Sequence, residues 1–254
     1  MAMSDERVAV VTGAGSGIGE ATARLLADQG LEVALVGRRR ERLDAVAAAI
    51  AETGGRTFPV PADLGRPRAP WEVVHAVLGA RGRLDVIVNN AAAYRLKPIE
   101  EMTLEDFDDV IATNLRAPYF LVQAALPALR LSSAPVVVNV SSAAAAMYRP
   151  QQTIYGLAKA ALEHMTMNMA AELAPDRIRV ACVRPGPVRT EFHLAAEDPE
   201  ERIRLLGTLV PLGRIGEPAD IARWICHLVD ADADWVTGAV ISVDGGRVLG
   251  PPGI

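Results

Sequence analysis

The chain has 254 residues, half of them apolar and only 4% aromatic, which suits one large α/β domain or two small ones. Its formal net charge of −5 argues against nucleic acid or an anionic membrane surface as the main partner. The sequence shows no signal peptide and no apolar run of membrane-spanning length, and its two scattered cysteines suit a reducing compartment, so a cytoplasmic protein is expected.

Short β-branched runs alternate with longer helical patterns along the chain. Strands are predicted at 7–12, 31–36, 56–60, 84–89, 135–140, 178–183 and 238–243. Most of them are apolar nearly throughout, which is typical of parallel strands covered by helices on both faces. Helices are predicted at 16–29, 39–53, 70–81, 104–131, 154–174 and 218–229. This alternation, with no linker, predicts one doubly wound Rossmann-type α/β domain over 1–254, with a parallel sheet of about seven strands.

One segment breaks this rhythm after the sixth predicted strand. Residues 186–217 combine Pro- and Gly-containing stretches with a charged run. Open parallel sheets bind ligands beyond the carboxyl ends of their strands, and long connections in compact domains tend to be functional. We therefore expect a loop and a helix there that act as a substrate lid. The acidic run at 197–202 is interpreted as an exposed helix start, and the four histidines lack metal-ligand spacing, so no metal site is expected.

A glycine-rich stretch joins the first predicted strand to the first helix. It contains Gly13, Gly17 and Gly19 in the spacing G-x-x-x-G-x-G. Such a turn needs permissive backbone angles, lets the backbone approach a pyrophosphate and presents the free N–H groups of a helix start to it. Glycine-rich turns also occur for packing alone. The position at the first strand–helix junction favours a dinucleotide site.

The end of the second predicted strand bears on the choice of cofactor. Domains that bind NAD usually carry an acidic residue here, which accepts a hydrogen bond from the ribose 2′-OH, whereas this chain has Gly37 and then Arg38. An arginine can pair with a 2′-phosphate. NADPH is therefore expected to be preferred, with NAD possible, and Arg39 and Arg40 are interpreted as a solvated helix turn.

A reactive pair is predicted in the helix over 154–174. Lys159, one of only two lysines, stands four residues after Tyr155, so both side chains lie on one helix face. A nearby ammonium favours the phenolate of a tyrosine, whose pKa is ordinarily about 10, and makes it a usable acid or base. Ser142 follows the fifth strand and could hold a substrate oxygen beside that phenol, with Ser141 as the alternative. Asn114 lies in a mostly apolar helix, where an amide needs a partner.

With these motifs in place, the chain resembles the short-chain dehydrogenase/reductase family of the roughly 250-residue kind. The family patterns T-G-x-x-x-G-x-G, N-N-A-G, Y-x-x-x-K and P-G-x-x-x-T are matched in order by TGAGSGIG (12–19), NNAA (89–92), YGLAK (155–159) and RPGPVRT (184–190). The resemblance covers almost the whole chain. Departures are Ala92 in place of a glycine, Ala181 where many relatives have an asparagine, and Ser16 in place of a basic residue found in some NADP-preferring relatives.

The resemblance implies a hydride transfer between a nicotinamide cofactor and a carbonyl or secondary alcohol. It implies a tetrad in which the tyrosine exchanges a proton with the substrate oxygen, the serine orients that oxygen, the lysine binds the ribose and lowers the tyrosine pKa, and the asparagine holds the lysine through a water. The tetrad residues are Asn114, Ser142, Tyr155 and Lys159. The implied cofactor contacts are Gly13, Ser16, Gly17, Ile18, Gly19, Arg38, Asp63, Leu64, Asn90, Ala91, Tyr155, Lys159, Pro185, Gly186, Val188 and Thr190.

Two alternative functions remain open at this level. A 3-oxoacyl-carrier-protein reductase would need a basic patch to dock an acidic carrier, for which Arg130, Arg149 and Arg184 are candidates. A non-catalytic nucleotide-sensing protein on the same fold would be expected to have lost Tyr155 or Lys159.

The partners are expected to be a small substrate and further copies of the chain. A homo-oligomer, most simply a tetramer, is expected from the family resemblance and from the long apolar helices. The substrate is expected to have an apolar body, because the segments that resemble the family's pocket walls supply mostly apolar side chains. These are Tyr94, Leu96, Met147, Tyr148, Phe192 and Leu194.

Overall fold

The computed structural model describes residues 7–191 and 198–251, whose strands form one parallel sheet. The sheet order is β3-β2-β1-β4-β5-β6-β7, and all six strand pairs are parallel. The strands are β1 (Val8–Thr12), β2 (Glu32–Gly37), β3 (Arg56–Pro61), β4 (Val86–Asn89), β5 (Val136–Val140), β6 (Arg179–Pro185) and β7 (Val240–Val243). The predicted α/β doubly wound sheet of about seven strands is confirmed.

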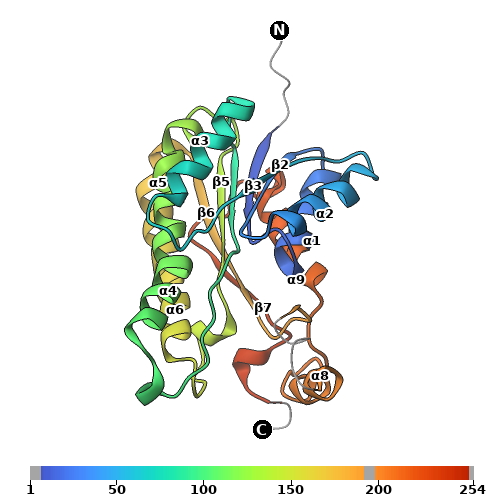
Figure 1. The fold of residues 1–254 in the computed structure, drawn as a ribbon, viewed down its shortest axis with the longest axis vertical. Helices are drawn as coiled ribbons and strands as arrows, with labels where there is room; N and C mark the ends of the chain where they lie inside the picture. The colour runs from blue at the N-terminus through green and yellow to red at the C-terminus, as the bar shows by residue number, and fades with distance from the viewer. Residues whose placement is uncertain (1–6, 192–197, 252–254) are drawn as a thin grey trace.

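Two layers of helices cover the sheet (Figure 1). One layer holds α1 (Gly17–Asp28), α2 (Arg40–Ala51) and α9 (Pro218–Val229), and the other holds α3 (Ala69–Arg81), α4 (Leu104–Ile111), α5 (Ala117–Leu129) and α6 (Thr153–Leu173). Successive strand residues point to opposite faces, so Ala9 and Val11 pack with the first layer while Val8 and Val10 pack with the second. The inner strands β1, β4 and β5 are almost entirely apolar because both of their faces are buried.

The prediction of one continuous helix over 104–131 is wrong, because the structure divides this stretch into two helices. Between α4 and α5 the backbone widens into a π-helical turn over Ala112–Arg116. The buried side chain of Asn114 lies in this turn, and both polar atoms of its amide bond the backbone of Ala93 in the loop after β4. A π turn inserts one residue into a helix and so re-aims the neighbouring side chains, often at a functional site. The pairing with Ala93 is a tertiary contact that helical periodicity does not contain.

The expected excursion after β6 is present. The chain leaves the sheet and returns to it at one narrow neck, a parallel bridge between Val188 and Gly216. Two backbone bonds close the neck: the amide of Arg189 donates to the Gly216 carbonyl at 2.8 Å, and the amide of Gly216 donates to the Pro187 carbonyl at 2.9 Å. The segment in between carries α8 (Pro199–Thr208), which lies at the carboxyl end of the sheet (Figure 1). Its start agrees with the helix predicted from the acidic run.

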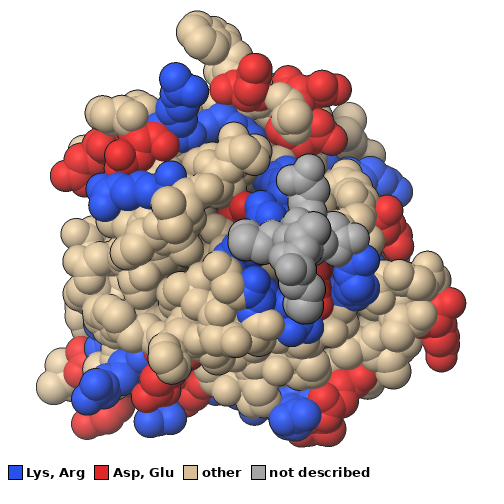
Figure 2. All heavy atoms as spheres, turned by 90° about the horizontal axis from the view of Figure 1, so that it is seen from above, with Lys and Arg blue, Asp and Glu red and all other residues tan. Residues whose placement is uncertain are grey.

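The opposite end of the sheet carries charges of both signs. Figure 2 shows basic and acidic side chains interspersed over this face. At the amino ends of the strands, Arg83 pairs with Asp85 at 2.9 Å and Arg130 pairs with Asp176 at 2.8 Å. Within the described residues, no helix is both long and apolar enough to cross a membrane.

Candidate active site

A cleft of about 510 Å³ opens at the carboxyl ends of the strands. The loops after β1, β2, β3, β4, β5 and β6 line it, together with the first turns of α6. Every residue predicted to contact the cofactor lines this cleft except Gly19, which lies behind the glycine loop. Three predicted tetrad members, Ser142, Tyr155 and Lys159, also line it, and the fourth, Asn114, does not.

The glycine loop forms a tight cradle between β1 and α1. Gly13 and Gly17 have positive φ angles of 68° and 56°, a region that favours glycine. A Cβ on Gly19 would lie 2.2 Å from the carbonyl oxygen of Gly13, so the helix approaches the loop more closely than any side chain allows. Ser16, the residue before α1, makes no side-chain capping bond to the helix. The helix start therefore presents free N–H groups to the cleft, which fits the pyrophosphate of a dinucleotide.

Two residues fasten this loop to the neighbouring strand. The amide side chain of Asn90 donates to the Thr12 carbonyl at 2.9 Å. The Thr12 hydroxyl accepts from the backbone amides of Asn90 and Ala91, at 2.9 and 3.0 Å, and donates to the Val88 carbonyl at 3.2 Å. Thr12 was missed as a site residue, although it opens the motif by which the loop was found. It joins the two loops that form one wall of the cleft.

The loop after β2 brings several guanidinium groups to the cleft. Arg38 is exposed, lines the cleft and has no ion pair or hydrogen bond within the described residues. Arg39 is exposed at the start of α2, as its interpretation as part of a solvated turn expects, and it also lines the cleft. It pairs with Glu191 at 3.1 Å, and Arg42, which was not predicted, pairs with the other oxygen of the same carboxylate at 3.2 Å. Helical spacing could not reveal these ion pairs, because Glu191 comes from the excursion after β6.

The reactive cluster is built where β5 and α6 meet. Lys159 is only 2% exposed, and its ammonium donates to the Val140 carbonyl at 2.8 Å and lies 5.8 Å from the centre of the Tyr155 ring. Gly156 makes the approach possible, because a Cβ there would lie 2.9 Å from the Ala144 carbonyl oxygen. The Ser142 hydroxyl accepts from the Ala144 amide at 3.2 Å and also interacts with the Tyr155 hydroxyl. Serine, tyrosine and lysine therefore converge on one wall.

Burial, more than charge, controls the two titratable groups of this cluster. It raises the pKa of Tyr155 above its ordinary value, and the hydrogen bond from Ser142 only partly opposes this. Burial also lowers the pKa of Lys159 to about 8, although the nearby Cys182 and Glu163 oppose this shift. The lowering of the tyrosine pKa that the resemblance implies for Lys159 stays a prediction, because here the ammonium bonds the Val140 carbonyl and not the phenol.

The alternative serine has a different task. The Ser141 hydroxyl donates to the Glu163 carboxylate at 2.6 Å, and Arg184 holds that carboxylate with two further bonds of 2.6 and 2.7 Å. Glu163 lies one helical turn after Lys159 and is buried. This network of Ser141, Glu163 and Arg184 packs against the backbone of Lys159 and was not predicted. It leaves Ser142, not Ser141, free to face the Tyr155 hydroxyl.

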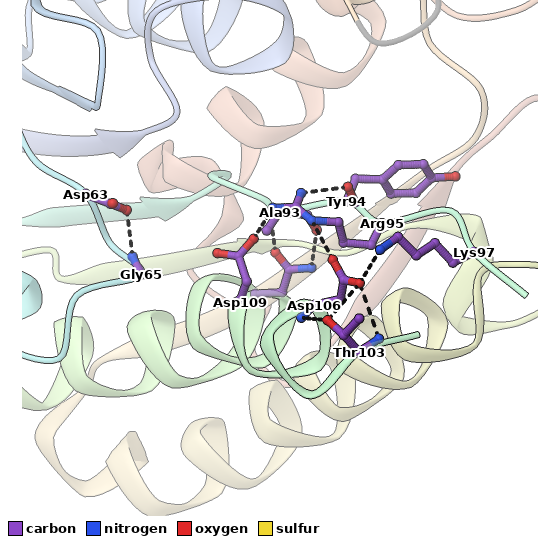
Figure 3. Close-up of polar contacts among 10 residues, drawn as sticks. Asp63, Gly65, Ala93, Tyr94, Arg95, Lys97, Thr103, Asp106 and Asp109 are labelled. Atoms are coloured by element: carbon purple, nitrogen blue, oxygen red, sulfur yellow. Dashed lines mark hydrogen bonds and ion pairs between the residues drawn. The ribbon is translucent and has the colours of Figure 1, made fainter. Parts of the chain in front are cut away.

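The loop after β4 is held from below by α4 and the π turn (Figure 3). The Asn114 amide bonds the Ala93 backbone at 2.7 and 2.8 Å. Arg95 pairs with Asp109 and with Asp106, and Lys97 donates to Asp106 at 2.5 Å, so α4 anchors the loop through three further contacts. None of these anchors was predicted, because they join residues that no helical or strand spacing relates.

Only part of the predicted substrate wall lies at the cleft. Among the residues predicted from sequence, Tyr94 lines it and packs against Tyr155. Leu96 and Tyr148 are exposed, and Met147 does not line the cleft. Phe192 and Leu194 lie outside the described residues. In the described part of the chain, no three His, Cys, Asp or Glu side chains gather as a metal site would require.

The three arginines named as candidates for docking an acidic carrier do not all reach the cleft. Arg130 pairs with Asp176 near the amino end of β6, and Arg184 pairs with the buried Glu163, whereas only Arg149 lines the cleft. The three arginines belong to different parts of the chain: Arg130 follows α5, Arg184 lies within β6, and Arg149 follows the short helix Ala143–Ala145.

Comparisons with known proteins agree with this fold and cleft. A family model described as enoyl-(acyl carrier protein) reductase matches residues 13–247. The chain is 38% identical to an uncharacterized oxidoreductase of Methylorubrum extorquens, covering 97% of this chain and 99% of that protein. It is 35% identical to the 3-oxoacyl-[acyl-carrier-protein] reductase FabG of Thermotoga maritima, covering 96% and 98%.

Two solved structures share this fold. The angucycline C-6 ketoreductase LanV, determined with bound NADP, has a TM-score of 0.89 and 37% identity over 96% of both chains. A second structure of LanV, with NADP and rabelomycin, has a TM-score of 0.85 and 35% identity over 96% of this chain and 97% of that one. These matches define an NAD(P)-dependent oxidoreductase. More particularly, the chain belongs to the short-chain dehydrogenase/reductase family, as the sequence motifs indicated.

Proposed function

We propose that this enzyme transfers a hydride between NADP(H) and a carbonyl or secondary alcohol, with Tyr155 as the acid and base. The observation that carries the proposal is the convergence of Ser142, Tyr155 and Lys159 on one wall of the cleft that also contains the glycine cradle. The nicotinamide supplies or accepts the hydride. A non-catalytic nucleotide sensor would have no need of this convergence.

In the reductive direction the Tyr155 hydroxyl donates its proton to the substrate oxygen, and the Ser142 hydroxyl holds that oxygen in place by a hydrogen bond. The resulting phenolate lies close to Lys159, whose ammonium stands 5.8 Å from the centre of the Tyr155 ring. Moving that ammonium from the Val140 carbonyl towards the phenol and the ribose hydroxyls would stabilise the phenolate. Asn114 acts as a positioning residue, because its amide holds the loop that carries Tyr94.

We propose NADP(H) as the preferred cofactor. The free guanidinium of Arg38 supports this, because it suits a 2′-phosphate and because Gly37 offers no carboxylate to repel one. The NADP bound in LanV supports it too. Gly13, Gly17 and Ile18 would hold the pyrophosphate, Asp63 and Leu64 the adenine, and Val188 and Thr190 the nicotinamide amide.

We also propose that residues 186–217 act as the lid of a single catalytic domain that works in the cytoplasm as a homotetramer. The neck at Val188 and Gly216 supports the lid, and the two free buried cysteines suit a reducing compartment. Exposed apolar side chains on α5 and α6 support self-association, among them Tyr119, Leu157 and Met167. Light scattering at micromolar concentration tests the tetramer, and a monomer there contradicts it.

A second candidate is a 3-oxoacyl-carrier-protein reductase, which the likeness to FabG favours. The scattering of Arg130, Arg149 and Arg184 counts against docking of an acidic carrier on that patch. A panel of ketones, secondary alcohols and 3-oxoacyl thioesters, run with NADPH and with NADH, separates the two. The first proposal expects turnover of free lipophilic ketones, in keeping with an apolar substrate body. Turnover of thioesters alone would favour the second, and no turnover of any member would contradict both.

A further inference from the structure

Two arginines line the cleft beside the reactive cluster. Arg149 lies in the loop between Ser142 and Tyr155, and Arg247 follows β7. Gly186 brings the segment of Arg247 to the cleft, because the Asp244 backbone packs so tightly against it that a Cβ on the glycine would lie 2.7 Å away. Both arginine side chains are half-buried. Within the described residues, neither makes an ion pair or a side-chain hydrogen bond.

The acidic residues near these arginines are engaged elsewhere. Seven basic and three acidic residues line the cleft, so its charge is strongly positive although the chain is acidic overall. Of the three acids, Asp109 pairs with Arg95, Glu191 bonds Arg39 and Arg42, and Asp63 accepts from the amide of Gly65.

Asp244 is the acid that follows β7 directly, and it does not pair with Arg247 either. Its carboxylate is 8% exposed and accepts from the backbone amides of Gly246 and Val248, at 3.0 and 2.8 Å. Burial lowers the pKa of Arg247, and the positive charge of Arg149 lowers it further, whereas the negative charge of Asp244 raises it.

Like charges that line one cleft without an ion-pair partner destabilise a folded protein, and such local conflicts concentrate at functional sites. A guanidinium offers planar pairs of donors that match a carboxylate or a phosphate, and an oxyanion bound between two of them would relieve the repulsion. We propose that Arg149 and Arg247 form a subsite for an anionic group of the substrate. The substrate is then a carbonyl compound that carries a carboxylate or a phosphate beyond its apolar body. This proposal rests on the proposed function, because it places the reacting carbonyl at Ser142 and Tyr155.

The test compares acids with their neutral esters. The substrates are 3-oxobutanoate, 4-oxopentanoate, 5-oxohexanoate and 6-oxoheptanoate, each with its methyl ester, reduced with NADPH by the wild type and by R149Q/R247Q. The control is R66Q/R223Q, which removes the same charge from exposed positions whose ion pairs are long, at 4.0 and 3.5 Å. For at least one chain length, kcat/KM of the wild type should favour the acid by about tenfold or more, as for one charge-assisted contact. The double variant should lose that preference, and the control should keep it.

A second arm identifies the source of the anion. It compares 3-oxobutanoyl-4′-phosphopantetheine with 3-oxobutanoyl-pantetheine, which lacks the phosphate. A preference for the phosphorylated thioester alone, lost in R149Q/R247Q, supports the subsite and assigns it to a phosphate. A preference among the keto acids assigns it to a carboxylate. Equal kcat/KM within every pair, or a preference that R149Q/R247Q retains, overturns the proposal.

Binding separates failure of this subsite from failure of the proposed function. Calorimetric titration of each keto acid and its ester into the protein with NADP⁺ needs no turnover. Tighter binding of an acid to the wild type than to R149Q/R247Q supports the subsite even if no compound is reduced, in which case the proposed reaction is wrong. If the esters are reduced but the wild type and R149Q/R247Q bind the acids equally, the proposed reaction stands and the subsite is wrong.

Discussion

The ring of Tyr94 packs edge-on against the ring of Tyr155, with centroids 4.5 Å apart and planes at 79°. Aromatic pairs prefer this geometry. Tyr94 belongs to the loop that Asn114 holds through Ala93, and Tyr155 belongs to α6. Burial raises the pKa of Tyr94 to about 12, and the neighbouring Tyr155 adds to this shift. Packing therefore connects the π turn to the proposed acid, and Asn114 can fix the position of Tyr155 without touching it.

Replacement of Tyr155 by phenylalanine should abolish most of the turnover and leave NADPH binding nearly unchanged. The change deletes the proton donor and keeps the ring that packs on Tyr94. A positioned acid contributes about 10²- to 10⁴-fold, so kcat should fall by at least that order. Lys159→Ala should impair both turnover and binding, because it also removes a ribose contact. Steady-state kinetics and fluorescence titration of NADPH measure the two effects. Retention by Tyr155→Phe of more than about a tenth of wild-type turnover would refute the acid/base role.

The buried ammonium of Lys159 should make stability depend on pH in a defined direction. Its pKa is about 8 in the folded protein and 10.5 in the ordinary state, so the unfolded chain binds more protons between these values. Stability from this group therefore rises as pH rises through that window. Relative to Lys159→Met, the wild type should gain on the order of 2 kcal/mol in unfolding free energy between about pH 7.5 and 9.5. Urea denaturation of both proteins measures it, and a constant difference between them would contradict the shift.

The preference for NADPH over NADH should depend mainly on Arg38. A charge-assisted bond to a 2′-phosphate is worth about 1.5–3 kcal/mol, and Ser16 adds no second charge, so we expect about a tenfold preference. The double change Gly37→Asp with Arg38→Ala should reverse it, because repulsion replaces attraction. Values of kcat/KM for both cofactors in both proteins decide the matter. A wild type that favours NADH would show the assignment to be mistaken.

Glu191 should weaken the binding of NADPH by occupying Arg39 and Arg42. Its carboxylate lies 3.1 and 3.2 Å from their guanidinium groups at the adenosine end of the cleft. Glu191→Gln should lower the dissociation constant of NADPH about two- to fivefold, the range of an exposed ion pair, and change that of NADH less. Glu200→Gln is the control, because Glu200 pairs with Arg189 on the exposed side of the same excursion. Equal effects of the two changes on NADPH would argue against a specific role.

The sheet and the glycine loop were largely predictable because both depend on local signals. Strand boundaries followed apolar runs, and the glycine loop followed from backbone demands that few other residues meet, such as the positive φ of Gly13. What escaped prediction depends on contacts between distant segments. The division of the helix at Asn114 needs the backbone of Ala93, and the place of Arg39 in the cleft needs Glu191. The pKa of Tyr155 follows from burial that no i to i+4 spacing reveals.

The neck between Val188 and Gly216 has a consequence for how such an enzyme can diversify. The chain leaves the sheet and returns at adjacent points, so residues added or removed between them shift no strand. Lengthening a flexible loop costs little entropy once its ends are fixed, on the order of 0.6 kcal/mol per doubling. The mouth of the cleft can therefore evolve by insertion and deletion while the glycine cradle stays constant. One ancestral scaffold can in this way acquire new substrates and still bind the dinucleotide.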